Sequence, residues 1–182
     1  MKITQLECTA SRLSEPIAAE AKDLQATGRA SNSNAIYVAP TGCLQYFTEP
    51  TGVITSFNYN LNAGIYPGMM NYAICFRRQT ATEVLELKAV VFDLGGGPKD
   101  SLESQLDNNC FEQDGAAQTK DYLMIPEGTI KNKNVRATYF CKHSIDGQTV
   151  SSTNPGPLMV SFHSDAHQSQ GHAGFYITYK II

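Results

Sequence analysis

The 182-residue sequence predicts an all-β fold, an antiparallel β-sandwich, preceded by an N-terminal extension over residues 1–42. Two observations carry this prediction. From residue 43 onward, apolar residues recur with a period of two in short runs, which is the pattern of half-buried strands. Glycine, proline and asparagine bound these runs, and no helical segment separates them as parallel strands would require. We therefore expect one domain over residues 43–182.

The extension contains one segment with helical features, residues 14–28. Ser14 is a suitable N-cap, Pro16 stands in the first turn, alanines favour a helix, and Gly28 can end it. Residues 30–34, rich in serine and asparagine, follow as a linker. A single short helix outside the sandwich is expected.

Strands are predicted over residues 71–76, 83–94, 157–163 and 174–181. In all but the second, alternate apolar residues point to one face, and these residues are Tyr72, Ile74, Phe76, Leu158, Val160, Phe162, Phe175, Ile177, Tyr179 and Ile181. Residues 83–94 are apolar on both parities, so this strand is either central or carries a bulge. The long polar stretch over residues 95–120 is expected to form a surface insertion.

Composition and motifs exclude several function classes. The 14 basic and 17 acidic residues give a net charge of -3, so no basic surface for nucleic acid is expected. No apolar run approaches the roughly 18 residues that cross a bilayer, so no membrane insertion is expected. The sequence has neither GxSxG nor HExxH, and its glycine-rich LGGGPKDS lacks the Gly-Lys-Ser/Thr ending of a phosphate loop. We expect a protein that is not an enzyme.

The five cysteines favour disulfides over a metal site, because they are widely spaced and form no CxxC pair. Cys43 and Cys75 are 32 residues apart, and Cys110 and Cys141 are 31 apart. Bridges closing such loops would each stabilise the fold by roughly 3–4 kcal/mol and persist in oxidising compartments. We therefore predict a secreted, extracellular protein, with five reduced cysteines in a cytosolic protein as the alternative. Cys8 is left over, either for a partner outside the chain or as a free thiol.

Three of the four histidines lie close together in FHSDAHQSQGH, residues 162–172. His163, His167 and His172 are candidate ligands for zinc or copper, and with zinc they would suggest a metal-dependent enzyme. The four-residue step between the first two aligns ligands on a helix, whereas this segment is predicted as strand followed by loop. Solvated loop histidines are the alternative interpretation.

Four blocks of sequence, in order, resemble the CUB domain family. The blocks are CLQYFTEPTGVITSFNYN, GIYPGMMNYAICF, DYLMIPEGT and VSFHSDAHQSQGHAGFYITY, and the resemblance covers residues 43–182. It implies a jelly-roll-like β-sandwich with disulfides. Two departures from the family stand out. Cys75 lies on the strand face opposite to that of Tyr72, so a disulfide from Cys8 to Cys43 or Cys75 is an alternative. Lys142 stands where the family has glycine.

GCLQYF and NYAICFRR are most similar to the CUB domains of arthropod secreted proteins, which often occur in tandem. In those proteins a strand similar to KITQLEC ends the first domain. The resemblance therefore implies that residues 1–8 are the tail strand of an upstream CUB domain, which would account for Cys8.

Many CUB domains bind one calcium ion at an end of the sandwich, and the resemblance carries three of the residues involved onto Asp121, Asp165 and Tyr66. The family's glutamate is missing, because GGGPK follows the VFDL strand. Candidate substitutes are Asp93, Glu103, Asp107 and Glu112. In the alternative without an ion, Asp121 and Asp165 accept hydrogen bonds from loop amides.

The resemblance implies an extracellular, non-enzymatic protein-binding module that contacts other proteins or matrix through loops at one end, with calcium as its cofactor. A structural protein that self-assembles into cuticle, shell or coat is the alternative. The partners expected are other extracellular proteins, an upstream CUB domain or further copies of the chain.

Overall fold

The computed structural model describes residues 39–60, 64–95, 101–111, 120–166 and 172–182. The predicted helix over residues 14–28, Cys8 and His167 lie outside these ranges. Within them the chain forms nine strands and two short 3-10 helices. The elements are β1 (Cys43–Phe47), β2 (Thr51–Thr55), β3 (Asn71–Phe76), β4 (Leu85–Asp93), η2 (Glu103–Gln105), η3 (Asp107–Cys110), β5 (Tyr122–Ile130), β6 (Val135–Phe140), β7 (Thr149–Ser152), β8 (Leu158–His163) and β9 (Gly174–Ile181).

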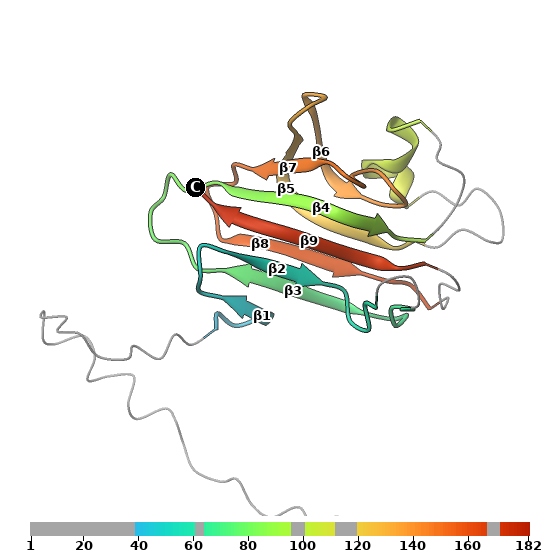
Figure 1. Cartoon of the computed structure of the whole chain (residues 1–182), viewed down its shortest axis with the longest axis horizontal. Helices are drawn as coiled ribbons and strands as arrows, with labels where there is room; N and C mark the ends of the chain where they lie inside the picture. The colour runs from blue at the N-terminus through green and yellow to red at the C-terminus, as the bar shows by residue number, and fades with distance from the viewer. Residues whose placement is uncertain (1–38, 61–63, 96–100, 112–119, 167–171) are drawn as a thin grey trace, which may run out of the picture. The chain divides into compact units, whose positions relative to one another are not determined.

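The strands form one curled sheet in the order β1-β3-β8-β5-β7-β4-β9-β2, with β6 paired to β5 (Figure 1). Every pair is antiparallel except β1 with β3, which is parallel. The predicted sandwich is therefore confirmed, with its two layers continuous through β5. Among the described residues, no helix is long and apolar enough to span a membrane.

Strand β5 turns the sheet from one layer into the other. Its first residues, Tyr122 to Met124, pair with β8, whereas Gly128 to Ile130 pair with β7. Between them the register with β6 shifts, and Glu127 has a φ of 51°. A Cβ on Gly128 would lie 2.8 Å from the Ala137 carbonyl oxygen, so the bend requires glycine.

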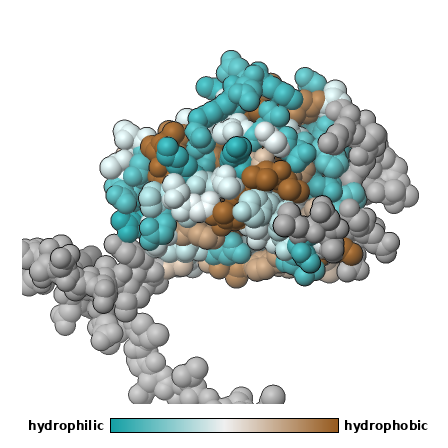
Figure 2. All heavy atoms as spheres, viewed as in Figure 1, coloured by the Kyte–Doolittle hydropathy of each residue, from teal (hydrophilic) through white to brown (hydrophobic). Residues whose placement is uncertain are grey.

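The core fills the space between the layers with the side chains that the alternation predicts. The predicted residues of β3 and β8, together with Phe175, Ile177 and Tyr179 of β9, are all buried, whereas Ile181 is half-buried at the edge of the core. In β4, a bulge between Ala89 and Val91 changes the parity that faces inward, which explains the apolar residues on both parities. Figure 2 shows the outer face over β4, β9 and β2, where hydrophilic and neutral side chains surround small hydrophobic areas.

Both predicted disulfides are present. Cys43 pairs with Cys75 at a Cα–Cα distance of 5.8 Å, and Cys110 pairs with Cys141 at 5.7 Å. The first joins edge strand β1 to its neighbour β3, although the register places Cys43 opposite Ala73 and Cys75 opposite Tyr46. The second fastens η3 of the surface insertion to the end of β6.

Arg78 holds the loops together at the end of the sheet where β3 finishes. Its guanidinium donates to four carbonyl oxygens, those of Ala81 (3.3 Å), Glu83 (3.1 Å), Asn154 (2.7 Å) and Pro155 (3.0 Å). These carbonyls belong to the β3–β4 and β7–β8 connections, so one side chain links two loops that are far apart in sequence. A planar fork of donors is required for this geometry.

We expect Arg78→Lys to lower the free energy of unfolding by about 1–3 kcal/mol, because an ammonium reaches fewer of the four carbonyls and leaves others without a donor. Urea unfolding measures the change. Arg136→Lys, at an exposed position of β6, is the matched control and should change stability by less than about 0.5 kcal/mol. Equal effects of the two substitutions would show that Arg78 does not hold the loops.

Candidate functional site

The candidate site lies at the end of the sheet where β4 and β8 finish and β5 and β9 begin, at the right in Figure 1. The antiparallel pairing of β4 with β9 and of β5 with β8 brings these strand ends together. The loop that precedes β3 contributes Tyr66 to the same end. Chain segments that are far apart in sequence, such as the loop with Tyr66 and the start of β9, therefore meet here.

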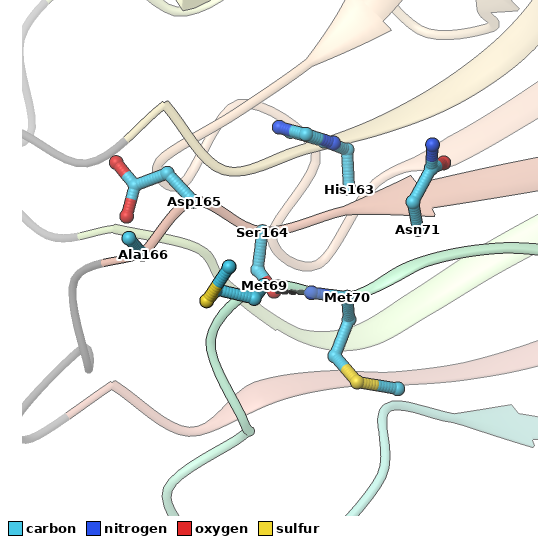
Figure 3. A pocket seen from close by; sticks show the side chains of 7 residues that line it. All are labelled: Met69, Met70, Asn71, His163, Ser164, Asp165 and Ala166. Carbon is cyan, nitrogen blue, oxygen red and sulfur yellow. Dashed lines mark hydrogen bonds between the residues drawn. The ribbon is translucent and has the colours of Figure 1, made fainter.

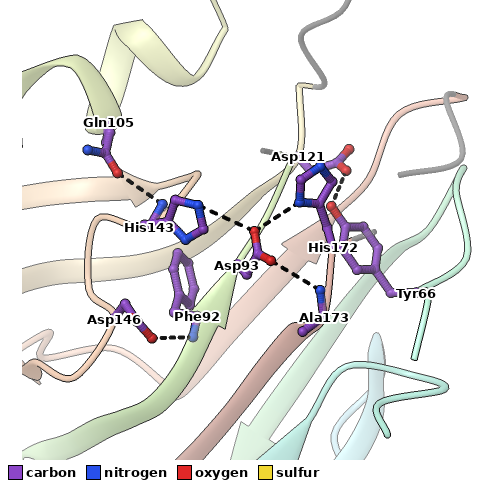
Figure 4. A network of polar contacts seen from close by, with 9 residues as sticks. All are labelled: Tyr66, Phe92, Asp93, Gln105, Asp121, His143, Asp146, His172 and Ala173. Atoms are coloured by element: carbon purple, nitrogen blue, oxygen red, sulfur yellow. Dashed lines mark hydrogen bonds and ion pairs between the residues drawn. The ribbon is translucent and has the colours of Figure 1, made fainter. Parts of the chain in front are cut away.

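The centre of the site is the carboxylate of Asp121, whose residue is fully buried. The Tyr66 hydroxyl donates to its Oδ2 at 2.5 Å, and the backbone N–H of Asp165 donates to its Oδ1 at 2.7 Å. Figure 4 shows the Tyr66 ring beneath the carboxylate. The Tyr66 ring packs closely on Gly174, where a Cβ would lie 3.2 Å from ring atom Cδ1. The same Cβ would lie 2.1 Å from Ser56 Oγ, and the φ of Gly174 is 84°, so Ser56 and the backbone conformation are the main reasons for glycine at the start of β9.

Burial raises the pKa of Asp121 above the ordinary aspartate value of 3.8. The hydrogen bonds from Tyr66 and from the Asp165 amide lower the pKa, and the Asp165 carboxylate raises it again. His163 has a smaller lowering effect. The two carboxylates thus share one end of the sheet, and burial works against the charge of the inner one.

Asp165 is held by contacts from three directions. Its Oδ2 accepts a hydrogen bond from the backbone N–H of Lys120 at 2.9 Å, and its carbonyl oxygen accepts one from Met69 N at 2.6 Å. With its N–H bound to Asp121, the residue is fixed between β5 and the loop before β3. Of the four predicted calcium-site residues, the structure therefore brings Tyr66, Asp121 and Asp165 into one network.

Asp93, the fourth predicted residue, makes a separate set of contacts at the same end. Its Oδ1 lies 3.0 Å from Nδ1 of His172 and 3.6 Å from Nε2 of His143, and its Oδ2 accepts the Ala173 N–H at 3.3 Å (Figure 4). Sequence analysis did not identify His143, because it lies in the turn after β6, fifty residues from Asp93, and belongs to no motif. Only the fold reveals this pair of histidines on one carboxylate.

The other candidate acids lie elsewhere or outside the described ranges. Oδ1 of Asp107 accepts hydrogen bonds from the backbone N–H groups of Thr138 (2.7 Å) and Tyr139 (3.0 Å) in β6, so it supports η3 against the sheet. Glu103 is exposed in η2, and Glu112 is not described.

The two described members of the histidine cluster make different contacts. His163 stacks on the ring of Tyr122 at a centroid distance of 4.9 Å, and His172 bonds to Asp93. Among the residues that the structure describes, no group of three or more histidines, cysteines and acids is placed to hold a metal ion. His167 lies outside them, so the cluster as a whole stays a prediction.

Tyr66 and Tyr72 offer a matched pair of buried hydroxyls. Tyr72 Oη is buried and makes no hydrogen bond of standard geometry, although the Phe57 backbone lies close enough to lower its pKa in part, and burial raises that pKa to about 12. We expect Tyr66→Phe to lower the free energy of unfolding by about 1.5–3 kcal/mol, because a buried carboxylate loses a donor. Tyr72→Phe should change it by less than about 0.5 kcal/mol or increase it. Chemical denaturation of both variants checks the ranking, and a reversed order would contradict it.

The raised pKa of Asp121 gives a pH dependence of known sign. The folded state retains the Asp121 proton from pH 3.8 up to the raised pKa, so the contribution of this group to stability is present below 3.8 and is lost as the pH rises through the folded pKa. The test compares the free energy of unfolding of the native protein with that of Asp121→Asn, both in EDTA. The native value minus the variant value should fall as the pH rises from 3.8 to the raised pKa, and it should stay constant above that pKa. A difference that rises with pH would show that Asp121 is stabilised as the anion.

Comparisons with known proteins identify the family of the chain. Residues 40–182 match the family model described as the animal CUB domain. No curated protein matches the sequence. Among solved structures, the CUB1-EGF-CUB2 domains of rat MASP-1 align over 75% of this chain and 42% of their own, with 17% identity and a TM-score of 0.47. This chain thus spans less than half of that structure.

Two further structures have comparable scores. The full extracellular region of zebrafish Gpr126/Adgrg6 aligns over 78% of this chain and 15% of its own length, with 23% identity and a TM-score of 0.47. The MASP-1 CUB2 domain bound to Ca²⁺ aligns over 76% of this chain and 98% of its own, with 19% identity and a TM-score of 0.41.

Proposed function

Because the chain belongs to the animal CUB domain family, whose members are protein-interaction modules of extracellular proteins, we propose that it is a secreted, non-enzymatic binding module. Its contact surface is the end of the sheet that carries Asp121 and Asp165, and calcium supports the contact. The observation that carries the proposal is the buried Asp121 carboxylate, held by Tyr66 beside a second carboxylate.

Two carboxylates support the assignment of a hard cation to this end of the sheet, and the ion would need further oxygen ligands. Carboxylate oxygens are the ligands that calcium prefers, and Asp121 and Asp165 supply two carboxylates within one hydrogen-bond network. Burial has already removed water from Asp121 and disfavours its negative charge, so a cation would offset that cost. Tyr66 would orient the Asp121 carboxylate through its hydroxyl. Asp93 would be a further ligand only if its carboxylate gave up its contacts with His172 and Ala173.

Binding of a protein partner follows from the same charges. The half-buried Asp165 carboxylate, with the buried Asp121 carboxylate beneath it, would attract a basic side chain, and the ion would fix both carboxylates in one geometry before the partner arrives. The disulfides are consistent with an oxidising, extracellular environment.

Calcium should raise the melting temperature of the protein relative to EDTA. An ion at about one hundred times its dissociation constant adds roughly 2.7 kcal/mol to the stability of the state that binds it. Differential scanning fluorimetry at millimolar calcium measures the shift. Asp165→Asn should remove most of it, whereas Glu86→Gln, which removes a surface carboxylate of β4, should retain it.

Magnesium serves as a second control, because Mg²⁺ is smaller than Ca²⁺ and requires a stricter octahedral coordination. The absence of a calcium shift in the native protein would remove the ion from the proposal. An equal shift in Asp165→Asn would place the ion elsewhere.

A further inference from the structure

The two outer faces of the sandwich differ in charge. Glu86, Lys88 and Lys180 lie at outward positions of β4 and β9, on the face that Figure 2 shows. The opposite face is formed by β3, β8 and the first residues of β5, with β1 and β6 at its borders, and we call it the β3–β8 face. Its outward residues on the two central strands are Asn71, Ala73, Cys75, Met159, Ser161 and His163.

The strand register places these outward side chains in rows. Ala73 lies opposite Ser161, and Ser161 lies opposite Met124 of β5. None of the outward residues of β3 and β8, nor Tyr122 or Met124 in β5, is an aspartate, glutamate, lysine or arginine. The β3–β8 face therefore offers methionine, tyrosine and small side chains without a permanent charge.

Figure 3 shows the alternation where β3 begins and β8 ends. The side chains of Asn71 and His163 extend to one side of the two strands, whereas those of Met70 and Ser164 extend to the other. Met70 packs against the core, and Ser164 is buried. The outward row therefore continues to the ends of both strands.

Aromatic rings stand at both borders of the face. Phe111, which follows η3, packs edge-to-face on Tyr122 at a ring-centroid distance of 5.2 Å and on Tyr139 of β6 at 4.8 Å. The Phe111 side chain is 38% exposed. At the other border, Tyr46 of β1 lies opposite Cys75. The alanine and serine between these borders have much smaller side chains.

This composition is typical of protein interfaces, whose cores are enriched in aromatic residues and methionine and depleted of charged residues. A charged partner surface would lose its hydration here without gaining a counter-ion. The chain itself supplies a surface that meets this condition, because the β3–β8 face lacks acids and bases although each copy carries a net charge of -3. Contact through this face keeps the charges of two copies apart.

We propose that two copies of the chain form a dimer by packing their β3–β8 faces on each other about a two-fold axis. An axis parallel to the strands through Ala73 and Ser161 brings the Phe111 border of each copy onto the Tyr46 border of the other. The dimer does not use the carboxylates of the candidate site, so this inference goes beyond the proposed function.

The size of the face sets the expected strength of the dimer. Five strands about 4.8 Å apart and roughly six residues long cover about 24 Å by 20 Å, so two faces together bury roughly 1,000 Å². This area is near the lower limit of specific interfaces. We therefore expect a dissociation constant of roughly 10–100 μM.

Sedimentation equilibrium of the full chain in EDTA, from micromolar to millimolar concentration, tests the proposal. The native protein should pass from monomer to dimer, and salt up to about 0.5 M should not weaken the dimer, because the face has no charges to screen. The ¹³C resonances of the methionine methyl groups locate the contact. Those of Met124 and Met159 should shift with protein concentration, whereas that of Met70 should not.

Ser161→Glu places a charge at the centre of the face. It should raise the dissociation constant at least about tenfold, because the contact would bury a carboxylate without a counter-ion. Thr178→Glu, at a half-buried outward position of β9, is the matched control and should change the constant by less than about twofold. A mixture of Ser161→Glu and Ser161→Lys should dimerise again, because the two-fold axis brings opposite charges together.

A native protein that stays monomeric at millimolar concentration overturns the inference, as do equal effects of the two glutamate substitutions. A dimer that requires calcium also overturns it, since the contact would then lie at the Asp121 end. Melting temperatures show whether the variants fold. If Ser161→Glu does not fold, the methionine resonances of the native protein decide, and a shift of Met70 without shifts of Met124 and Met159 contradicts the proposed face.

Discussion

The buried carboxylate of Asp121 is the group on which this end of the domain depends. A carboxylate without solvent needs donors, and here they come from Tyr66 in the loop before β3 and from the backbone of Asp165 after β8. Satisfying one side chain therefore fixes the relative positions of three segments. The same burial raises the pKa of Asp121, so the fold leaves a site at which a cation would be stabilising.

The rest of the sheet provides the rigidity that this network requires. β5 begins at the site between β8 and β6 and then bends into the second layer, so the site is attached to both halves of the core. The two disulfides secure the edge strand β1 and the insertion that carries η3, and each would contribute roughly 3–4 kcal/mol by restraining the unfolded chain. At the same end, Ser164 fastens the loop before β3, so the candidate site residues lie on loops that a stable sheet positions.

The strands could be predicted from the sequence because alternation is a local property, whereas the apolar residues of β4 on both parities left a central strand and a bulge as alternatives, and the structure shows both. Tyr66, Asp121 and Asp165 were predictable only through their motifs, which the family resemblance supplied. The contacts of His143 with Asp93 were not predictable, because they join residues that are distant in sequence. The relation to arthropod proteins, self-assembly and an upstream domain that pairs with Cys8 stay predictions on which the fold has no bearing.

The most direct test of the central role of Asp121 is a ¹³C NMR titration of its side-chain carboxyl, in EDTA and in calcium. Without the ion, the pKa should lie above 3.8, because burial outweighs the two hydrogen bonds. With calcium, the pKa should fall markedly, since the cation favours the ionised form. A pKa at or below 3.8 in EDTA, or one that calcium does not change, would contradict the assignment of this carboxylate as the centre of the site.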